Sequence, residues 1–175
     1  MLAAYALAAA LLSAEPASPA ASLVASKVDF SGTWKLDLAA SDPLDDLLAA
    51  QGASWIERKA AGSFVVTQKV SNKPEGLEVC VESSLGTKCN LVKAGQGWEE
   101  KETEKGKVRG RADWSEDGKA LVVTTELTLK DKKPAQMIVT RSLEDEGKTT
   151  VQTLELKIKD GKAYKARRIL RRQGK

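Results

Sequence analysis

Two arginines in the last third of the sequence lie on the apolar faces of runs in which apolar and polar residues alternate. Arg141 occupies an odd position of residues 136–143 and Arg168 an even position of residues 164–171, and in both runs that face is the more apolar one. A buried guanidinium without an anion, water or carboxylate partner is costly, and guanidinium groups bind carboxylates through two parallel hydrogen bonds. Two such arginines on nearby strands therefore indicate a shared anionic ligand. The inward faces of this region add three candidate ligand-binding residues: Gln152, Tyr164 and Leu170.

The composition argues against an enzyme. The sequence of 175 residues contains no His, so it offers no Ser-His or Cys-His dyad, no histidine general base and no zinc site with histidine ligands. Its carboxylates lie mostly in solvated charged runs such as 99–107 and 144–148, and no Gly-rich phosphate loop follows a strand. We therefore expect no catalytic residue, no metal ion and no cofactor.

The N-terminal segment has the pattern of a secretory signal peptide. An apolar run over residues 1–12 precedes a stretch rich in Ala, Ser and Pro, and the candidates for the last residue of the signal are Ala14, Ala20 and Ala21. The run is shorter than the roughly 20 apolar residues that span a bilayer, and no Lys or Arg precedes it, so the signal is atypical. We expect residues 1–20 to be a signal peptide, residues 21–28 a disordered leader, and the protein to be exported to the periplasm or the extracellular space. A disordered Ala-rich tail is the alternative reading.

The two cysteines, Cys80 and Cys89, flank a turn signal. A two-residue connection at Ser84 and Leu85 would place them opposite each other and permit a disulfide in an oxidising compartment. A three-residue loop with Gly86 in the left-handed conformation would instead put them on opposite faces of the sheet. The sequence alone does not choose between the two registers.

Turn signals at roughly every 8 to 12 residues divide the rest of the chain into short alternating strands. They lie at residues 71–76, 83–86, 94–97, 104–107, 115–119, 130–134, 144–148 and 159–162. Together with a first strand near residue 32, they define about ten strands joined as hairpins. A meander of this length usually closes on itself to remove its edges. We therefore expect a mainly β, ten-stranded antiparallel up-and-down barrel, a single domain over residues 29–175.

Two helix signals separate the first strand from the second. Ser41 or Asp42 is a suitable N-cap for a helix over residues 43–51. A capping box at residues 54–57 opens a second helix over residues 55–61. Such a helix-turn-helix can cover the rim of a closed barrel as a lid. Its candidate portal residues are Leu44, Leu47, Leu48 and Trp55.

These features together resemble the fatty-acid-binding protein family of the calycin superfamily, which also contains the lipocalins. The resemblance is carried by residues Gly32 to Leu36 on the first strand, the helix pair, the meander of ten strands and the pair Arg168-Ile169 near the end. It covers residues 29–171. It implies a small lipocalin-like barrel that holds an apolar ligand in an internal cavity beneath a two-helix lid.

The resemblance also implies a head-group site. Family members commonly hold the ligand carboxylate with two arginines and a tyrosine, and the second arginine and the tyrosine form Arg-x-Tyr on the last strand. Arg141 and Arg168 match the arginines, whereas Leu170 stands at the tyrosine position and Tyr164 lies six residues earlier on the same face. The ligand implied is a fatty acid, or a lipid or pigment with another anionic group.

Other readings remain open on the sequence alone. Glu100, Glu102 or Glu126 could neutralise the arginines, or an arginine could pack over Trp34 at the closed end of the barrel. The protein would then be a ligand-free calycin-type barrel that acts as a protein-interaction or inhibitor module in the cell envelope. Lys and Arg outnumber Asp and Glu by 28 to 24, which is consistent with a transient contact with anionic membrane. No aromatic platform for bases accompanies these charges, so we expect no nucleic-acid partner. We also expect a monomer.

Overall fold

The computed structural model describes residues 27–84, 86–103, 106–159 and 161–174. The predicted signal peptide and most of the predicted leader lie outside the described residues. The described chain forms ten strands, two α-helices and one short 3-10 helix, Asp145–Gly147. The strands are β1 (Gly32–Asp37), β2 (Thr67–Lys73), β3 (Gly76–Ser83), β4 (Gly86–Val92), β5 (Glu99–Thr103), β6 (Gly106–Trp114), β7 (Ala120–Thr128), β8 (Pro134–Glu144), β9 (Thr149–Ile158) and β10 (Ala163–Arg172).

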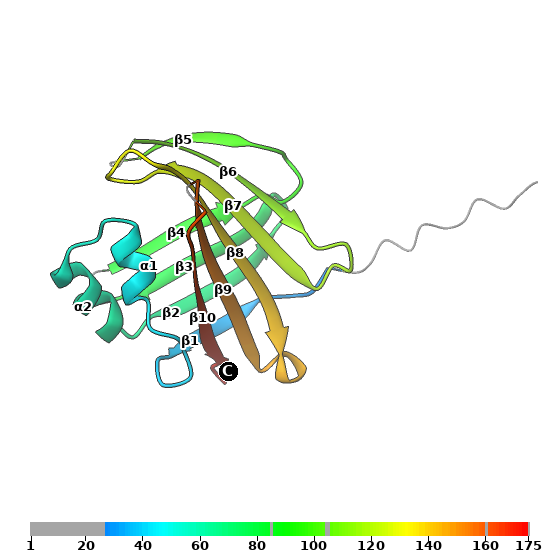
Figure 1. Ribbon diagram of the computed structural model, residues 1–175. Helices are drawn as coiled ribbons and strands as arrows, with labels where there is room; N and C mark the ends of the chain where they lie inside the picture. The colour runs from blue at the N-terminus through cyan, green and yellow to red at the C-terminus, as the bar shows by residue number, and fades with distance from the viewer. Residues whose placement is uncertain (1–26, 85, 104–105, 160, 175) are drawn as a thin grey trace, which may run out of the picture.

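All ten strands belong to one sheet, in the order β4-β3-β2-β1-β10-β9-β8-β7-β6-β5. Successive strands pair antiparallel from β1 to β4 and from β5 to β10, and the first strand also pairs with the last, so the meander curls round on itself. Figure 1 shows β2 to β4 lying behind β7 to β10, with both helices at one end of the sheet. The predicted fold class, a ten-stranded up-and-down barrel with a helix pair between its first two strands, is confirmed.

The barrel has a gap between β4 and β5, the two edges of the sheet, because no ladder joins them in the described residues. The curled meander therefore keeps two strand edges at this point. The segment between the two strands docks on β6 instead: Gly95 donates its backbone N–H to the carbonyl of Ala112 at 2.8 Å, and Ala94 forms an isolated bridge with the same residue. Gly95 and Gly97 have φ values of 81° and 80°, which turn the chain away from β4 before β5 begins.

The second helix, α2 (Trp55–Ser63), begins as predicted. Ser54 accepts a hydrogen bond from the backbone N–H of Glu57, and the carboxylate of Glu57 accepts one from the N–H of Ser54 at 2.6 Å. The helix continues past its predicted end at residue 61. The hydroxyl of Ser63 donates to backbone carbonyls one turn earlier and stabilises this extra part.

The first helix, α1 (Asp45–Ala50), is shorter than the predicted 43–51 and starts differently. Neither Ser41 nor Asp42 is its N-cap: the cap position is Leu44, which makes no side-chain hydrogen bond. The side chains of Ser41 and Asp42 instead accept hydrogen bonds from two backbone N–H groups of β10, at 2.9 and 2.8 Å. These bonds fasten the loop before α1 to β10 at the end of its ladder with β1, and hold the helix pair at that end of the barrel.

Two apolar clusters occupy the barrel interior. The first contains Phe30, Trp34, Leu36, Val70, Leu77, Ala112, Leu121 and Leu170. The second contains Leu47, Leu129, Ala135, Leu156, Ile158 and Ala166, so it includes one residue of α1 and carries the helix pair. Along β10 the inward positions pass from Ala166 in the second cluster, through Arg168, to Leu170 in the first. The level between the two clusters is where the candidate site lies.

Candidate functional site

Three polar side chains form a row across the inner face of the barrel, between the two apolar clusters. The register pairs Gln152 of β9 with Arg141 of β8 on one side and with Arg168 of β10 on the other. Directly opposed residues of antiparallel strands point to the same face and are neighbours, so the ladder itself brings these side chains together. Three of the five ligand-binding candidates from the sequence therefore belong to this row.

A fourth polar residue, Gln68 of β2, reaches the row from across the barrel. Its Oε1 accepts hydrogen bonds from Nη2 of Arg141 at 2.6 Å and from Nε2 of Gln152 at 3.1 Å. In the sheet, β1 and β10 separate β2 from β9, so these bonds cross the interior instead of joining adjacent strands. Gln68 is not among the candidates from the sequence. Its signal is the alternation of Val66, Gln68 and Val70, which puts one amide on an apolar strand face.

Arg141 is buried, and the described residues offer it no counter-charge. The residue is only 7% exposed, and its Nη1 has no hydrogen-bond partner among the described residues. Burial lowers the pKa of Arg141 from its ordinary value to about 10, which leaves the side chain charged at neutral pH. The guanidinium carbon lies 5.9 Å from the ring centroid of Phe30, a weak cation–π contact. Arg141 therefore has both a positive charge and a hydrogen-bond donor to offer a ligand.

Arg168 is the more accessible of the two arginines. It is half-buried, and burial lowers its pKa as well. Its Nε is buried and has no hydrogen-bond partner within the described ranges. The residue lines a pocket of about 440 Å³ between α2 and the loop before α1. Arg168 thus connects the row to the surface beneath the helix pair.

The carboxylates considered as internal partners lie elsewhere. Glu126 forms an ion pair with Arg109 of β6 at 3.6 Å, and Glu100 of β5 stands opposite the same arginine. In the part of the chain that the structure describes, neither Arg141 nor Arg168 takes part in an ion pair. Neutralisation of the two arginines by Glu100, Glu102 or Glu126 is therefore not observed there.

The arginine that packs over Trp34 is Arg172. Its guanidinium carbon lies 4.3 Å from the centroid of the indole ring, and the group donates to two backbone carbonyls at 2.8 and 3.0 Å. The structural role considered for Arg141 or Arg168 at this end of the barrel is thus filled by a different residue.

The outward arginines of β10 are paired. Arg167 donates to both carboxylate oxygens of Glu144 at 2.8 Å. Arg171 forms ion pairs with Asp37 at 3.2 Å and with Asp145 at 3.3 Å. The positive charge of this strand is therefore matched by nearby carboxylates on the outer face.

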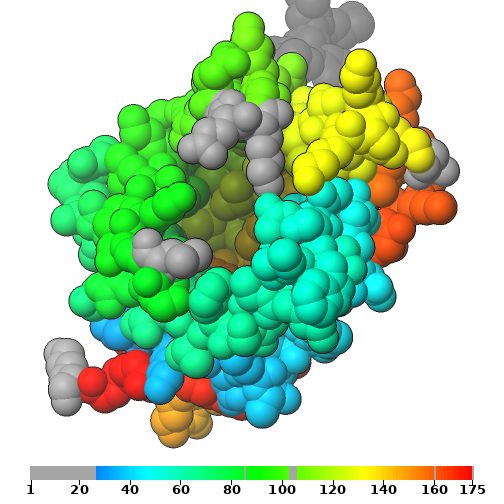
Figure 2. All heavy atoms as spheres, turned by 90° about the vertical axis from the view of Figure 1, so that its left-hand side faces the viewer, coloured from blue at the N-terminus to red at the C-terminus, as the bar shows by residue number. Residues whose placement is uncertain are grey.

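The helix pair borders a hollow that opens into the barrel. Figure 2 shows this hollow between the helices and the strands β3 and β4, with the far wall of the barrel at its floor. Apolar residues on the inner faces of β8 and β9, among them Met137, Val139 and Leu154, keep part of their surface accessible. Inward apolar side chains that remain accessible indicate an interior that the protein's own side chains do not fill.

The predicted portal residues have different surroundings. Leu47 is buried in the second cluster, and Leu44 packs against that cluster. Leu48 is half-buried. Trp55 is 63% exposed at the first position of α2, beside Ile56, which is 71% exposed. Leu44 and Leu47 therefore seat the helix pair on the barrel, whereas Trp55 projects into solvent.

The two remaining ligand-binding candidates lie outside the row. Leu170 is 1% exposed and belongs to the first cluster. Tyr164 pairs with Leu156 and packs against the second cluster. On this face Ala166 lies between Tyr164 and Arg168, so Tyr164 does not take the place of the tyrosine that the family has at the position of Leu170.

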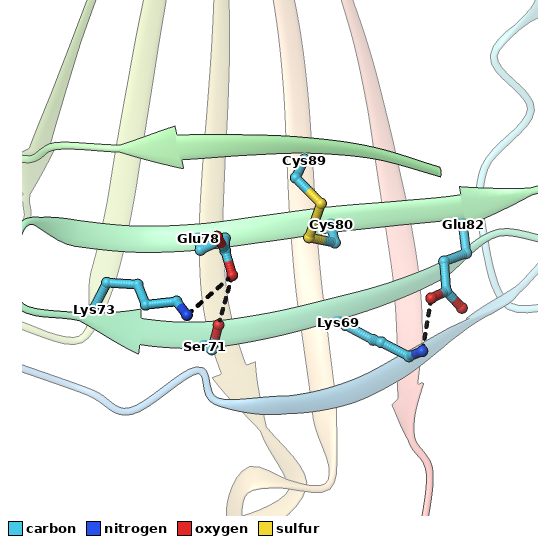
Figure 3. Close-up of a disulfide and its surroundings, with 7 residues drawn as sticks. All are labelled: Lys69, Ser71, Lys73, Glu78, Cys80, Glu82 and Cys89. Atoms are coloured by element: carbon cyan, nitrogen blue, oxygen red, sulfur yellow. Dashed lines mark hydrogen bonds and ion pairs between the residues drawn. A yellow bond between two sulfur atoms is a disulfide. The ribbon is translucent and has the colours of Figure 1, made fainter. Parts of the chain in front are cut away.

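Cys80 and Cys89 form a disulfide between β3 and β4 (Figure 3). The register pairs Ser83 with Gly86, which is the two-residue connection, and aligns the cysteines with their Cα atoms 3.9 Å apart. Of the two registers left open by the sequence, the structure has the one that brings the cysteines together. Two ion pairs between β2 and β3 flank the disulfide on the same face. Because β4 is an edge strand, the disulfide ties down one side of the gap between β4 and β5.

The row consists of guanidinium and carboxamide groups. Across the described ranges, no group of three or more His, Cys, Asp or Glu side chains is arranged to hold a metal ion. None of the described helices combines the length and the apolar character needed to cross a membrane.

No protein-family model matches the sequence, and no curated protein matches it. Solved structures do. Apo lipid binding protein 8 of Caenorhabditis elegans matches with a TM-score of 0.66 at 15% identity, over 82% of this chain and 95% of that chain. The fatty acid binding protein of Schistosoma mansoni in complex with arachidonic acid gives a TM-score of 0.62 at 21% identity, over 83% and 96%. As-p18, an extracellular fatty acid binding protein, gives 0.60 at 20% identity, over 82% and 96%. The described part of the chain therefore has the fold of the fatty-acid-binding proteins.

Proposed function

We propose that this protein binds and carries a small hydrophobic anion, a fatty acid or a similar lipid, inside its barrel. The observation that carries the proposal is the row of Arg141, Gln152 and Arg168, which holds two guanidinium groups with no carboxylate partner among the described residues. A carboxylate would supply the missing negative charge. It would also accept hydrogen bonds from Nη1 of Arg141 and Nε of Arg168, two buried donors that have no partner among the described residues.

The apolar part of such a ligand has a place on the helix side of the row. The hollow in Figure 2 opens there, and the inner faces of β8 and β9 keep accessible apolar surface. Burial of an alkyl chain contributes about 0.8 kcal/mol per methylene group, so the tail would supply affinity and the row would supply selectivity for an anion. The names of the similar structures, fatty acid and lipid binding proteins, support the same ligand class.

The proposal involves no covalent step, so the protein acts as a carrier and not as an enzyme. We also propose that it is exported and monomeric. The Ala-rich N-terminal pattern and the disulfide support export. A transient contact with anionic membrane during delivery is supported by Trp55 and Ile56, which are exposed at the start of α2 with Lys59 one turn later.

The test compares ligands that share one chain and differ in head group. Delipidated protein is titrated with palmitate, hexadecanol and hexadecylamine, and binding is followed by displacement of a fluorescent fatty acid. We expect palmitate to bind at least about tenfold more tightly than the alcohol, since one charge-assisted hydrogen bond is sufficient for that difference, and the amine to bind most weakly. Failure to take up any of the three, or an amine that binds as tightly as palmitate, would contradict the proposal.

A further inference from the structure

We propose that Gln68 determines how tightly the ligand binds and how strongly an anionic head group is preferred. In the ligand-free protein its amide oxygen lies beside Arg141, in the place that a head-group oxygen takes when a ligand binds. The inference rests on the proposed function and concerns the same row. It gives a role to a residue of β2 that the family resemblance does not single out.

Gln68 accepts hydrogen bonds from two members of the row. Arg141 carries donors only, and Gln152 contributes its Nε2 as a donor to the same oxygen. The contact with Arg141 is 2.6 Å long and comes from the opposite wall of the barrel. One neutral oxygen therefore stands between two donors, on the inner side of a guanidinium that is almost completely buried.

A neutral acceptor satisfies the hydrogen bond of Arg141 but not its charge. A carboxylate oxygen that replaces the amide oxygen keeps the hydrogen bond and adds charge neutralisation, so the exchange is favourable in a medium of low polarity. A hydroxyl oxygen that replaces it only exchanges one neutral acceptor for another. Gln68 thus lowers the free-energy cost of burying Arg141 in the ligand-free protein without neutralising its charge. The row keeps a positive charge that can attract an anionic ligand.

Two substitutions of similar size separate this role from a structural one. Gln68→Glu places a carboxylate beside Arg141, so an internal ion pair forms there and Arg168 remains as the uncompensated cation of the row. Gln68→Leu removes the competing oxygen and leaves Arg141 with its donors free. We expect Gln68→Glu to weaken palmitate binding at least tenfold and to reduce the preference for palmitate over hexadecanol, and Gln68→Leu to strengthen palmitate binding at least threefold.

The stability of the delipidated protein provides a second readout. We expect the midpoint of urea unfolding to rise for Gln68→Glu and to fall for Gln68→Leu, so that stability and palmitate affinity change in opposite directions. Gln136, on the outer face of β8, provides the matched control, because Gln136→Glu and Gln136→Leu make the same chemical changes away from the row. Both controls should bind palmitate within about twofold of wild type.

The outcomes are distinguishable. If wild type prefers palmitate and both Gln68 variants bind it as wild type does, the role of Gln68 is overturned and the proposed function stands. If both variants weaken palmitate binding to the same degree, Gln68 only supports the shape of the cavity, and the inference is equally overturned. If wild type itself binds no palmitate, it is the proposed function that fails.

Discussion

Replacing Arg141 with methionine should separate two effects of this residue: its contribution to ligand affinity, and the stability that its buried charge costs the ligand-free protein. Burial lowers the pKa of Arg141 to about 10, which corresponds to roughly 3 kcal/mol against the charged form. The charge-assisted hydrogen bond to Gln68 offsets roughly 1.5 to 3 kcal/mol of this. Methionine removes the charge, fills similar space and leaves Gln68 bonded to Gln152. We therefore expect delipidated Arg141→Met to be at least as stable as wild type, and at most about 1.5 kcal/mol more stable.

Urea unfolding of the delipidated proteins at neutral pH measures the stability, and displacement of a fluorescent fatty acid measures the affinity. We expect palmitate to bind roughly 10- to 150-fold more weakly, which corresponds to a loss of about 1.5 to 3 kcal/mol. The pKa of Arg141 is lowered but stays well above neutral, so the cost of its charge is present throughout the neutral range and is relieved only as the pH rises above about 10. The stability difference should therefore be the same at about pH 6 and pH 8.

Arg167→Met is the matched control. Arg167 lies on the outer face of β10 and pairs with Glu144 at 2.8 Å in solvent, so its loss should change stability by less than about 1 kcal/mol and leave palmitate affinity unchanged. The reasoning is refuted if Arg141→Met loses about 3 kcal/mol or more, which is the usual effect of removing one partner from a buried pair. Arg141 would then already be compensated inside the protein, and no ligand would be needed to explain it.

Three further substitutions test other parts of the structure. The double variant Cys80→Ser/Cys89→Ser should lose roughly 2 to 3 kcal/mol in urea unfolding, from the loop closed over a separation of 9 residues; a loss below about 1 kcal/mol would mean that the disulfide does not hold the edge. Arg172→Ala should lose about 1 to 3 kcal/mol with unchanged palmitate affinity, because it contacts Trp34 and two carbonyls outside the row, and weaker binding would place it in the site. Leu170→Tyr should lose about 1 to 3 kcal/mol by overpacking the first cluster; tighter palmitate binding would show instead that the tyrosine hydroxyl reaches Arg168.

Much of the fold could be predicted because its signals are local. Each hairpin connection is a short polar segment between alternating runs, and the capping box of Ser54 and Glu57 marks the start of α2. The gap between β4 and β5 could not be predicted, because it depends on Gly95 docking on β6, a contact between segments that are not neighbours in sequence. The N-cap of α1 was wrong for a similar reason: Ser41 and Asp42 have suitable side chains, but β10 offers them unpaired N–H groups.

The candidate site, like the fold, could be predicted only in part from the sequence. The faces of Arg141, Gln152 and Arg168 follow from alternation within each strand, and their order in the sheet follows from the meander. Alternation places Gln68 on an apolar strand face, but its contact with Arg141 could not be predicted, because that contact depends on how tightly the sheet curls and brings β2 opposite β8. The pairing of Cys80 with Cys89 required the turn between them, for which the sequence permits two registers.

The central claim is that the row of arginines binds a lipid anion in the barrel, and native mass spectrometry of the purified protein tests it most directly. The protein is purified without added lipid, a second sample is incubated with excess palmitate, and any bound molecule is extracted and identified. We predict one bound lipid per chain with an acidic head group, either carried through purification or taken up from palmitate. A protein that stays free of lipid in both samples would contradict the claim and leave Arg141 and Arg168 with a structural role.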